Sequence, residues 1–511
     1  MGNSPSTPTA PQMAELEATM DESVQRAAAA IAQADVLLLL TGAGWSADSG
    51  LSVYRDVADV AEYRERDLTY ASICEPHWFE DDPALAYGFW GKCFNDYRDT
   101  APHAGYGIVK RWRDAMFDGT ATSKRLAARH GGDAEAFFSF TSNVDAHHLG
   151  TFGASEVREC HGNSETWQCT DRECHTGAAG EEVATSRWAA PGGFRFAMDG
   201  ATQNAATGRP SEPPDGSVAQ HGFGNNRPAC PRCQKALRPS ILMFSDASWN
   251  DNAPQKERWT AWEQAVEAQA QAQVEAGEAP LHVAILEVGA GGNVTTVRSL
   301  AERTVESLRE KGGVATLVRI NPDLPLADSN SVQDATIGLP SYGLAAVQRI
   351  DEALNALRSQ GPAAVAARNA IPLLLETAPI DPKKEEPSPE ETSDPLQVKP
   401  REVPPSSPEE LAVIRETFAK IDTDGSGTLD RAEVENAGRM LGRVFYGTDL
   451  DDAMAAMDGD GNGEVDFAEF TAWWEGGGKL NASERFELKW AQFGARFDQL
   501  LADALGASGI K

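Results

Sequence analysis

The sequence predicts two folded regions, an α/β domain with a doubly wound parallel sheet and a C-terminal all-α domain. From about residue 24 to residue 355, apolar strands, Gly-rich turns and helical patterns alternate, as they do in a parallel sheet covered by helices. Residues 409–511 instead combine amphipathic helical patterns with two acidic, glycine-containing loops. The length of 511 residues also exceeds the roughly 100–200 residues that are usual for one domain.

Composition places the boundaries between these regions. Residues 1–20 are rich in Ser, Thr and Pro and predict a disordered N-terminal tail. The α/β domain follows at 21–365, and a polar Gly/Pro-rich insertion at 176–228 interrupts it. Residues 366–408 are Pro- and Glu-rich and predict a solvated linker. Residues 409–511 form the C-terminal domain.

Charge and hydropathy limit the compartment and the partners. The net charge of −32 argues against general electrostatic binding to nucleic acid or to an anionic membrane. No apolar run approaches the roughly 18 residues that span a bilayer, and the first residues do not resemble a secretory signal. We therefore expect an intracellular protein, cytoplasmic first, with a nuclear location or transient membrane association as alternatives. No feature of the sequence points to a particular oligomeric state.

The first strand ends in a turn of small residues. Val36–Leu40 has the composition of a buried parallel strand, and Gly42, Ala43 and Gly44 follow it. Small residues there let backbone N–H groups approach a pyrophosphate at the start of a helix. Because the spacing is not GxGxxG, the turn alone does not separate a nucleotide site from an ordinary loop. Three further strands end in Gly, Asn or Asp turns and would complete a ligand crevice: 137–145, 281–292 and 314–323.

Four of the seven cysteines form two close pairs. Cys169 and Cys174 are followed, after 55 residues, by Cys230 and Cys233 in a Cys-Pro-Arg-Cys knuckle. Four thiolates in this pattern predict a structural zinc site. The alternatives are four unliganded thiols, or His175 as a competing ligand.

Cys160 and His161 stand side by side and raise a question of catalysis. The cysteine could be a nucleophile activated by the histidine. Equally, His161 could be the base and Cys160 a bystander. The two residues by themselves leave both possibilities open.

Two twelve-residue loops predict paired calcium sites, with magnesium as the competing ion. The first loop presents its oxygen ligands at Asp422, Asp424, Ser426, Thr428 (through its carbonyl), Asp430 and Glu433. The second presents them at Asp458, Asp460, Asn462, Glu464 (through its carbonyl), Asp466 and Glu469. Gly427 and Gly463 occupy the sharp turns, the loops start 36 residues apart, and Leu429 and Val465 are positioned to pair across them.

A last helix is expected after the second loop. Asn481 and Glu484 resemble a capping box, and apolar residues follow at helical spacing up to Leu501. This helix either packs on the calcium-binding lobe as part of its core or occupies a groove that calcium opens.

The motifs of the α/β domain, taken in order, resemble the sirtuin family over roughly residues 20–355. They are Gly42–Asp56, Thr141–Asp145, His161–Gly162, the two cysteine pairs and Leu237–Pro239. The segment Arg238–Asp246 resembles members that carry RPNILMFGD. The resemblance implies NAD-dependent protein-lysine deacylation, a Rossmann-type sheet and a small zinc module at about residues 160–240.

Residue roles follow from that resemblance. It implies that His161 is the catalytic base, which takes a proton from a ribose hydroxyl, and that Cys160 is a bystander. It implies that Asn143 and Asp145 hold the nicotinamide end of NAD. The implied NAD contacts are Gly42, Ala43, Gly44, Ser46, Tyr54, Arg55, Ser142, Asn143, Asp145, Gly289 and Asn321. The implied substrate strand, which pairs with the acyl-lysine peptide, contains Ile241, Leu242 and Phe244.

The chain departs from the family pattern at several positions. Ser142 replaces Gln in Thr-Gln-Asn, Ser52-Val53 replaces Pro-Asp, and Gly289–Gly291 replaces Gly-Thr-Ser. Trp90 and Cys93 stand where acidic-acyl-selective members have Tyr and Arg, although Tyr97-Arg98 lies close by. Neither Trp90 nor Cys93 can pair with a carboxylate as Arg does, so we expect neutral acyl groups.

The sequence therefore predicts a calcium-regulated, NAD-dependent protein-lysine deacylase, most simply a deacetylase, that releases nicotinamide and O-acyl-ADP-ribose. Two alternatives are an ADP-ribosyltransferase and a calcium-sensing scaffold with a weakly active NAD-binding core. Intact His161, Asn143 and Asp145 favour an enzyme over the scaffold. A membrane is expected as a partner only if Gly2, in the start MGNSPS, is myristoylated.

Overall fold

The computed structural model describes most of the α/β region and parts of the C-terminal region, and these form two compact units that are treated separately. In the first unit it describes residues 7–52, 61–66, 68–130, 134–175, 187–199, 222–292 and 294–360. In the second it describes residues 415, 418–419, 421–422, 426–431, 433–434, 454, 457–459 and 462–475.

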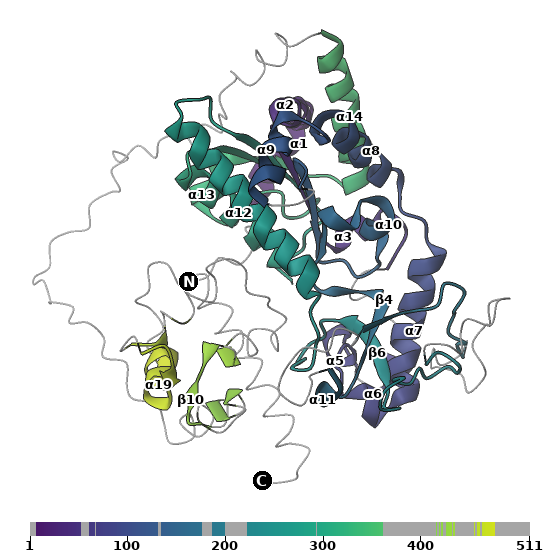
Figure 1. Ribbon diagram of the computed structural model, residues 1–511. Helices are drawn as coiled ribbons and strands as arrows, with labels where there is room; N and C mark the ends of the chain where they lie inside the picture. The colour runs from purple at the N-terminus through teal and green to yellow at the C-terminus, as the bar shows by residue number, and fades with distance from the viewer. Residues whose placement is uncertain are drawn as a thin grey trace, which may run out of the picture. The chain divides into compact units, whose positions relative to one another are not determined.

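A six-stranded parallel sheet forms the centre of the first unit (Figure 1). Its strands, in spatial order, are β3 (Val157–Glu159), β2 (Phe137–Thr141), β1 (Val36–Thr41), β7 (His282–Val288), β8 (Val314–Ile320) and β9 (Thr336–Leu339). The strand order changes direction between β1 and β7, which is the switch point where such sheets bind ligands. The predicted doubly wound α/β fold is confirmed.

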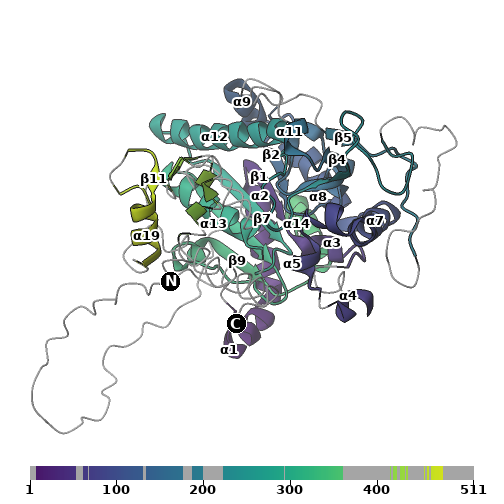
Figure 2. The same cartoon turned by 90° about the horizontal axis from the view of Figure 1, so that it is seen from below.

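Helices cover both faces of this sheet. The larger ones are α2 (Met20–Gln33), α8 (Ala104–Trp112), α9 (Ala121–His130), α12 (Ala253–Glu275), α13 (Thr296–Glu310) and α14 (Gly343–Gln360). Figures 1 and 2 show α2 beside α14 and α9 beside α12. Short helices lie at the carboxyl ends of the strands, at α3 (Ala43–Ala47) and α10 (His147–Thr151). Continuous apolar strands such as β1, buried along its whole length, require this cover on both faces.

The N-terminal segment is helical where disorder was expected. Helix α1 runs from Ala10 to Ala18. Thr9 and Gln12 form a capping box, in which the Gln12 N–H donates to Thr9 Oγ1 at 3.4 Å and the Thr9 N–H to Gln12 Oε1 at 2.9 Å. Pro11 lies in the first turn, where no N–H is needed. Leu16 is buried, so this helix gains apolar packing that the Ser/Thr/Pro composition did not reveal.

A smaller module packs beside the main sheet. Its antiparallel sheet contains β5 (Arg187–Ala189), β4 (Gly162–Cys169) and β6 (Leu237–Ile241), in that order. Its helices are α4 (Ala61–Glu65), α5 (Tyr70–Ile73), α6 (Trp78–Asp81), α7 (Pro83–Asp99) and α11 (Arg172–His175). An aromatic core that includes Phe94, Trp167 and Phe196 joins α7 to this sheet.

Three short segments complete the described secondary structure of the first unit. They are a π-helical turn at Arg113–Phe117 and two 3-10 turns at Ala154–Glu156 and Asn330–Ala335.

The second unit contains a two-stranded antiparallel ladder of β10 (Thr428–Leu429) and β11 (Val465–Asp466), followed by α19 (Phe467–Glu475). Leu429 pairs with Val465, as the sequence predicts. Both are buried, together with Phe418 and Phe470, whose ring centroids lie 5.5 Å apart.

Among the helices that the structure describes, none is long and apolar enough to cross a bilayer.

Candidate functional site

Two glycine loops meet at the switch point of the sheet. A Cβ atom at Gly42 would lie 2.6 Å from Ala290 Cα, and one at Gly44 would lie 2.7 Å from Gly289 Cα. Gly289 itself has φ +66°, a conformation that favours glycine. The N–H of Gly44 donates to the Gly289 carbonyl at 2.9 Å. The glycines therefore allow the loops after β1 and β7 to interlock, and the Gly44 N–H is used for this contact.

Asn143 and Asp145 follow β2 and are held against the loop after β1. Asn143 Nδ2 donates to the Gly42 carbonyl at 2.9 Å. The carboxylate of Asp145 accepts hydrogen bonds from the Ser46 hydroxyl and from the His147 N–H, the latter at 2.9 Å. Both Asn143 and Asp145 are more than nine-tenths buried. The structure thus brings three of the sequence-predicted NAD residues, Ser46, Asn143 and Asp145, into one hydrogen-bonded group.

The buried position of His148, between β1 and β2, was not predicted from the sequence. His148 is fully buried between Thr41 Oγ1 at 2.9 Å and Ser139 Oγ at 2.7 Å, and burial lowers its pKa to about 4. The Tyr106 ring contacts His148, with ring centroids 5.2 Å apart. The neutral imidazole, with a hydrogen bond at each ring nitrogen, therefore joins β1 to β2. The His147-His148 pair beside Asp145 was the available signal in the sequence.

His161 lies at the turn between β3 and β4, with one imidazole nitrogen free to accept a proton. Its ring donates a hydrogen bond to the Ser142 backbone. Its Nε2 atom is buried and has no hydrogen-bond partner among the described residues. Burial first, and then the Arg158 guanidinium, lower the pKa of His161 to about 4. A neutral ring that donates through one nitrogen presents the other as an acceptor, as a base requires.

Cys160 points into the main hydrophobic core and is fully buried. Its N–H donates to the Thr141 carbonyl at 2.9 Å, which continues the β2–β3 pairing. A thiol packed among apolar side chains is a poor nucleophile. This placement favours the bystander role for Cys160.

Two buried charges on β3 were also not predicted. Arg158 donates to Asp251 at 2.8 Å. Glu159 accepts from Asn163 Nδ2 at 2.5 Å and from Gln255 Nε2 at 3.3 Å. Burial raises the pKa of Glu159 to about 7. The sequence showed these residues only as a charged pair before the cysteine.

The residues predicted to contact the adenosine part of NAD, Gly289 and Asn321, lie in the loops after β7 and β8. Asn321 Nδ2 donates to the Ala290 carbonyl at 2.8 Å, while its Oδ1 accepts from the N–H groups of Asp323 and Leu324 at 2.9 Å each. Asn321 therefore fixes the backbone of the loops after β7 and β8 relative to each other. Tyr54 and Arg55, the other predicted NAD contacts near the first loop, lie outside the described residues.

These features fit NAD. The glycines let the backbones of the loops after β1 and β7 meet at the switch point of the sheet. Among the described residues, the buried Nε2 of His161 lacks a hydrogen-bond partner, which a ribose hydroxyl would supply. The residues that would hold NAD are the loop at Gly42–Ser46, Asn143 and Asp145 at the nicotinamide end, and the loops at Gly289 and Asn321 at the other end.

The predicted substrate strand follows β6 beside the base. The Leu242 N–H donates to the His161 carbonyl at 2.9 Å, and the Phe244 N–H donates to the Cys74 carbonyl at 2.9 Å. Ile241 is buried, whereas Leu242 and Phe244 are partly exposed. Because these two N–H groups bond within the protein, a bound peptide would have to pair with other backbone groups of the segment.

Arg98 is committed to the fold. Its Nε donates to Glu165 at 2.7 Å, its Nη1 donates to the Phe194 carbonyl at 2.9 Å, and the guanidinium lies 4.2 Å from the Phe94 ring centroid. It is therefore occupied in joining α7 to the small module. Trp90 and Cys93 are each 4% exposed.

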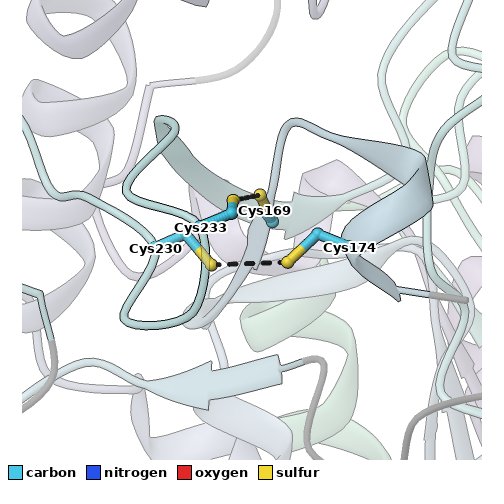
Figure 3. Close-up of side chains that lie close together, drawn as sticks. All are labelled: Cys169, Cys174, Cys230 and Cys233. Atoms are coloured by element: carbon cyan, nitrogen blue, oxygen red, sulfur yellow. Dashed lines mark hydrogen bonds between the residues drawn. The ribbon is translucent and has the colours of Figure 1, made fainter. Parts of the chain in front are cut away.

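The four cysteines meet at the tip of the small module (Figure 3). All four sulfur atoms lie within 4.8 Å of one another. Cys169 Sγ lies 3.4 Å from Cys233 Sγ, and Cys174 Sγ lies 3.7 Å from Cys230 Sγ. Four sulfurs at about 2.3 Å from one zinc ion would be about 3.8 Å apart, so the cluster fits a tetrahedral zinc site. The side chain of His175 lies outside the described residues.

The two acidic loops of the second unit have matching internal bonds. Asp422 accepts from the N–H groups of Ser426 and Gly427 at 3.0 and 2.9 Å, and Asp458 accepts from Asn462 and Gly463 at 3.1 and 2.8 Å. In each loop, the Glu carboxylate at position 12 accepts from the backbone N–H at position 9. Asp430 N–H donates to Glu433 at 3.0 Å, and Asp466 N–H donates to Glu469 at 2.9 Å.

The two loops are also joined by a side-chain bond. Thr428 Oγ1 donates to Glu464 at 2.9 Å. Asp424 and Asp460 lie outside the described residues.

Comparisons with known proteins agree with this division of the chain. Residues 42–274 match the model of the Sir2 family, and residues 411–475 match an EF-hand domain pair. An uncharacterized calcium-binding protein of Caenorhabditis elegans is 40% identical over 63 residues, which are 12% of this chain and 28% of that relative.

Two solved structures resemble the first unit. A mutant Sir2 homologue in complex with ADP-ribose is 17% identical, with a TM-score of 0.38, over 66% of this chain and 98% of that one. A Sir2 homologue in complex with NAD is 18% identical, with a TM-score of 0.36, over 65% and 93%. From the two family matches, the chain joins a Sir2-family domain to a C-terminal EF-hand pair.

Proposed function

We propose that the chain is an NAD-dependent protein-lysine deacylase, most simply a deacetylase. The observation that carries this proposal is the buried Nε2 of His161, which has no hydrogen-bond partner in the described part of the chain. His161 lies within the residues that match the Sir2 family.

The residues of the site suit this reaction. NAD, when bound, supplies an ADP-ribosyl group for the acyl oxygen and releases nicotinamide. His161 takes a proton from a ribose hydroxyl at Nε2, while its bond to the Ser142 backbone fixes the ring. Asp145, held by Ser46 and the His147 N–H, orients the nicotinamide end. The substrate is an acyl-lysine protein with a neutral acyl group, because Arg98 is occupied by Glu165.

The two metal sites have different roles in this proposal. Zinc on the four cysteines holds the small module together and does no chemistry, because four thiolates leave no open position. Calcium binds the paired loops at 422–433 and 458–469 and regulates the enzyme.

One assay tests the enzyme and the regulation together. Nicotinamide release from NAD is measured with an acetyl-lysine peptide, in saturating calcium and in chelator. The His161→Ala variant should lose activity by about 100-fold or more. The matched control His130→Ala changes a histidine on α9 and should keep it.

The products separate the possible outcomes. O-acetyl-ADP-ribose supports deacylation, whereas ADP-ribose on the acceptor would replace it with transfer. Activity that does not respond to calcium would overturn the regulatory role. No turnover in either condition would favour a calcium-sensing scaffold.

A further inference from the structure

Five charged side chains gather behind the loops after β7 and β8. Glu287 and Arg319 lie near the ends of β7 and β8. Arg298 and Glu302 lie on α13, and Asp328 lies after β8. Arg298 and Arg319 are fully buried, and Glu287 and Glu302 are 1% and 4% exposed. None of them belongs to the motifs that identify the site.

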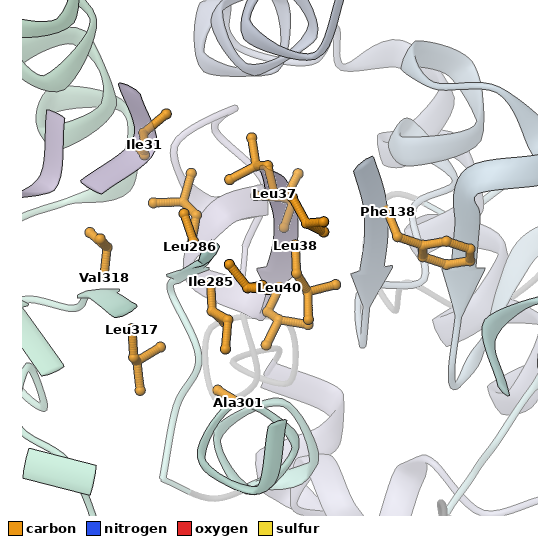
Figure 4. Packing of buried hydrophobic residues seen from close by; sticks show 14 of the residues in the cluster. Ile31, Leu37, Leu38, Leu40, Phe138, Ile285, Leu286, Ala301, Leu317 and Val318 are labelled. Atoms are coloured by element: carbon orange, nitrogen blue, oxygen red, sulfur yellow. The ribbon is translucent and has the colours of Figure 1, made fainter. Parts of the chain in front are cut away.

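The fold brings these charges to one face of the sheet. Figure 4 shows Ile285 and Leu317 on the side of the sheet where Ala301 of α13 lies. Since side chains alternate along a strand, Glu287 and Arg319, two residues further on, share that side. They are also direct neighbours in the β7–β8 register.

The charges form a connected network. Arg319 donates to Glu287 at 2.8 Å and to Glu302 at 2.9 Å. Arg298 donates to Asp328 at 2.6 Å and 2.8 Å. Burying charges in this way is costly and rarely stabilises more than apolar packing of the same volume. The network therefore needs an explanation other than stability.

Further bonds of the network go to the backbone of the segment that follows Asn321, the residue predicted to contact the adenosine part of NAD. Arg298 donates to the carbonyls of Leu324 and Leu326 at 3.0 and 3.1 Å, and Arg319 also donates to Leu326 at 2.9 Å. Glu302 accepts from the N–H groups of Asp328 and Ser329 at 2.6 and 3.0 Å.

The same network reaches the loop after β7. Arg298 Nη1 lies 3.5 Å from the Ala290 carbonyl, which also accepts from Asn321 Nδ2. One guanidinium thus contacts the loops after both strands. The predicted nicotinamide half of the site, at Asn143 and Asp145, follows β2, whereas the network is built on β7, β8 and α13.

We propose that Arg298 and its buried partners are positioning residues that set the affinity for the adenosine part of NAD and leave the chemistry at His161 unchanged. This inference rests on the proposed use of NAD. Because Arg298 holds the backbone of both loops, its loss should make these loops less preorganised for the ligand. We expect the Arg298→Met variant to bind ADP-ribose about tenfold to 100-fold more weakly. KM for NAD should rise by a similar factor with kcat unchanged.

The test is calorimetric titration of the full chain with ADP-ribose, together with KM and kcat for NAD. Arg309→Met is the matched control. Arg309 also lies on α13 and donates to Ser331 and Asp334 in the same downstream segment, but its side chain is 34% exposed. It should bind ADP-ribose like the wild type. Arg298→Lys should not restore ADP-ribose binding, because a lysine ammonium cannot reproduce the several N–H donors that the planar guanidinium holds in fixed directions.

Folding is monitored by thermal unfolding of each variant. If Arg298→Met does not fold, Glu302→Gln replaces one of the two oxygens that accept from the Asp328 and Ser329 N–H groups by an NH2 donor, with little change of shape. It should weaken ADP-ribose binding in the same direction. Unchanged ADP-ribose binding in a folded variant, or a fall in kcat with unchanged KM, overturns the inference.

The binding measurement also separates this inference from the proposed function. The wild-type chain could bind ADP-ribose in an Arg298-dependent way yet release no nicotinamide with acetyl-lysine peptide. That result would contradict the proposed deacylase activity and support the inference about Arg298. A wild-type chain that binds no ADP-ribose overturns both.

Discussion

Arg158, on the strand that leads to His161, donates to Asp251 at 2.8 Å with its guanidinium fully buried. The two charges act on His161 in opposite directions: Arg158 lowers its pKa and Asp251 raises it. Burial of His161 lowers its pKa most, and Arg158 lowers it further, so the imidazole is neutral near pH 7.

This arrangement predicts opposite pH effects from the two halves of one ion pair. The base works when neutral, so activity falls as the pH drops toward the pKa of His161, about 4. Arg158→Met leaves Asp251 unopposed and should raise that pKa by about one unit, whereas Asp251→Asn should lower it. The measurement is the ratio of kcat/KM at pH 5 to that at pH 8, which should fall in Arg158→Met only. Arg111→Met, which breaks the more exposed pair with Asp351, is the control. An equal fall of this ratio in Arg158→Met and Asp251→Asn would indicate lost packing and contradict the prediction.

Gly289 allows a second prediction. Its positive φ costs an Ala about 1–2 kcal/mol, and the added Cβ would lie 2.5 Å from the Trp45 nitrogen. Gly289→Ala should therefore lower the free energy of unfolding by at least that amount and separate the loops after β1 and β7. Urea unfolding and ADP-ribose titration measure the two effects. Gly291→Ala is the control, since a Cβ there meets nothing within 4 Å. Equal losses in the two variants would contradict the close approach.

Much of the fold was predictable because its signals are local. Val36–Leu40 is apolar throughout and ends at a glycine turn, so the strand that became β1 (Val36–Thr41) was evident. The twelve-residue loops fix their own ligand spacing, and the pairing of Leu429 with Val465 follows from it.

The parts that were missed depend on contacts distant in sequence. Glu287 and Arg319 each look like a polar end of an apolar strand, and only the β7–β8 register makes them partners. His148 binds Thr41, 107 residues away, across the β1–β2 boundary. Helix α1 was missed because Ser/Thr/Pro composition hides its capping box and the burial of Leu16.

The cysteine cluster gives a third prediction. Cys230→Ser should abolish stoichiometric zinc binding and lower the melting temperature, because three thiolates bind zinc more weakly and the metal contributes to folding stability. Zinc content by mass spectrometry of the intact chain and thermal unfolding are the measurements. Cys74→Ser, a change at another buried thiol outside the cluster, should lose some stability but keep one zinc per chain. Full zinc content in Cys230→Ser would show that the four sulfurs are not the ligand set.

The paired loops give a fourth prediction. Glu469 is the last ligand of the second loop and bonds the Asp466 and Gly459 N–H groups. Glu469→Gln removes the bidentate carboxylate and should weaken calcium binding at that loop by about tenfold or more. Because β10 and β11 are paired and Thr428 bonds Glu464 across the loops, the first loop should also bind more weakly. Calorimetric titration of the chelated full chain with calcium measures both sites. Glu464→Gln removes a charge from the same loop while keeping its carbonyl ligand, so it should retain two sites. A loss of one site in Glu464→Gln as large as in Glu469→Gln would mean that net charge, and not ligand geometry, governs binding.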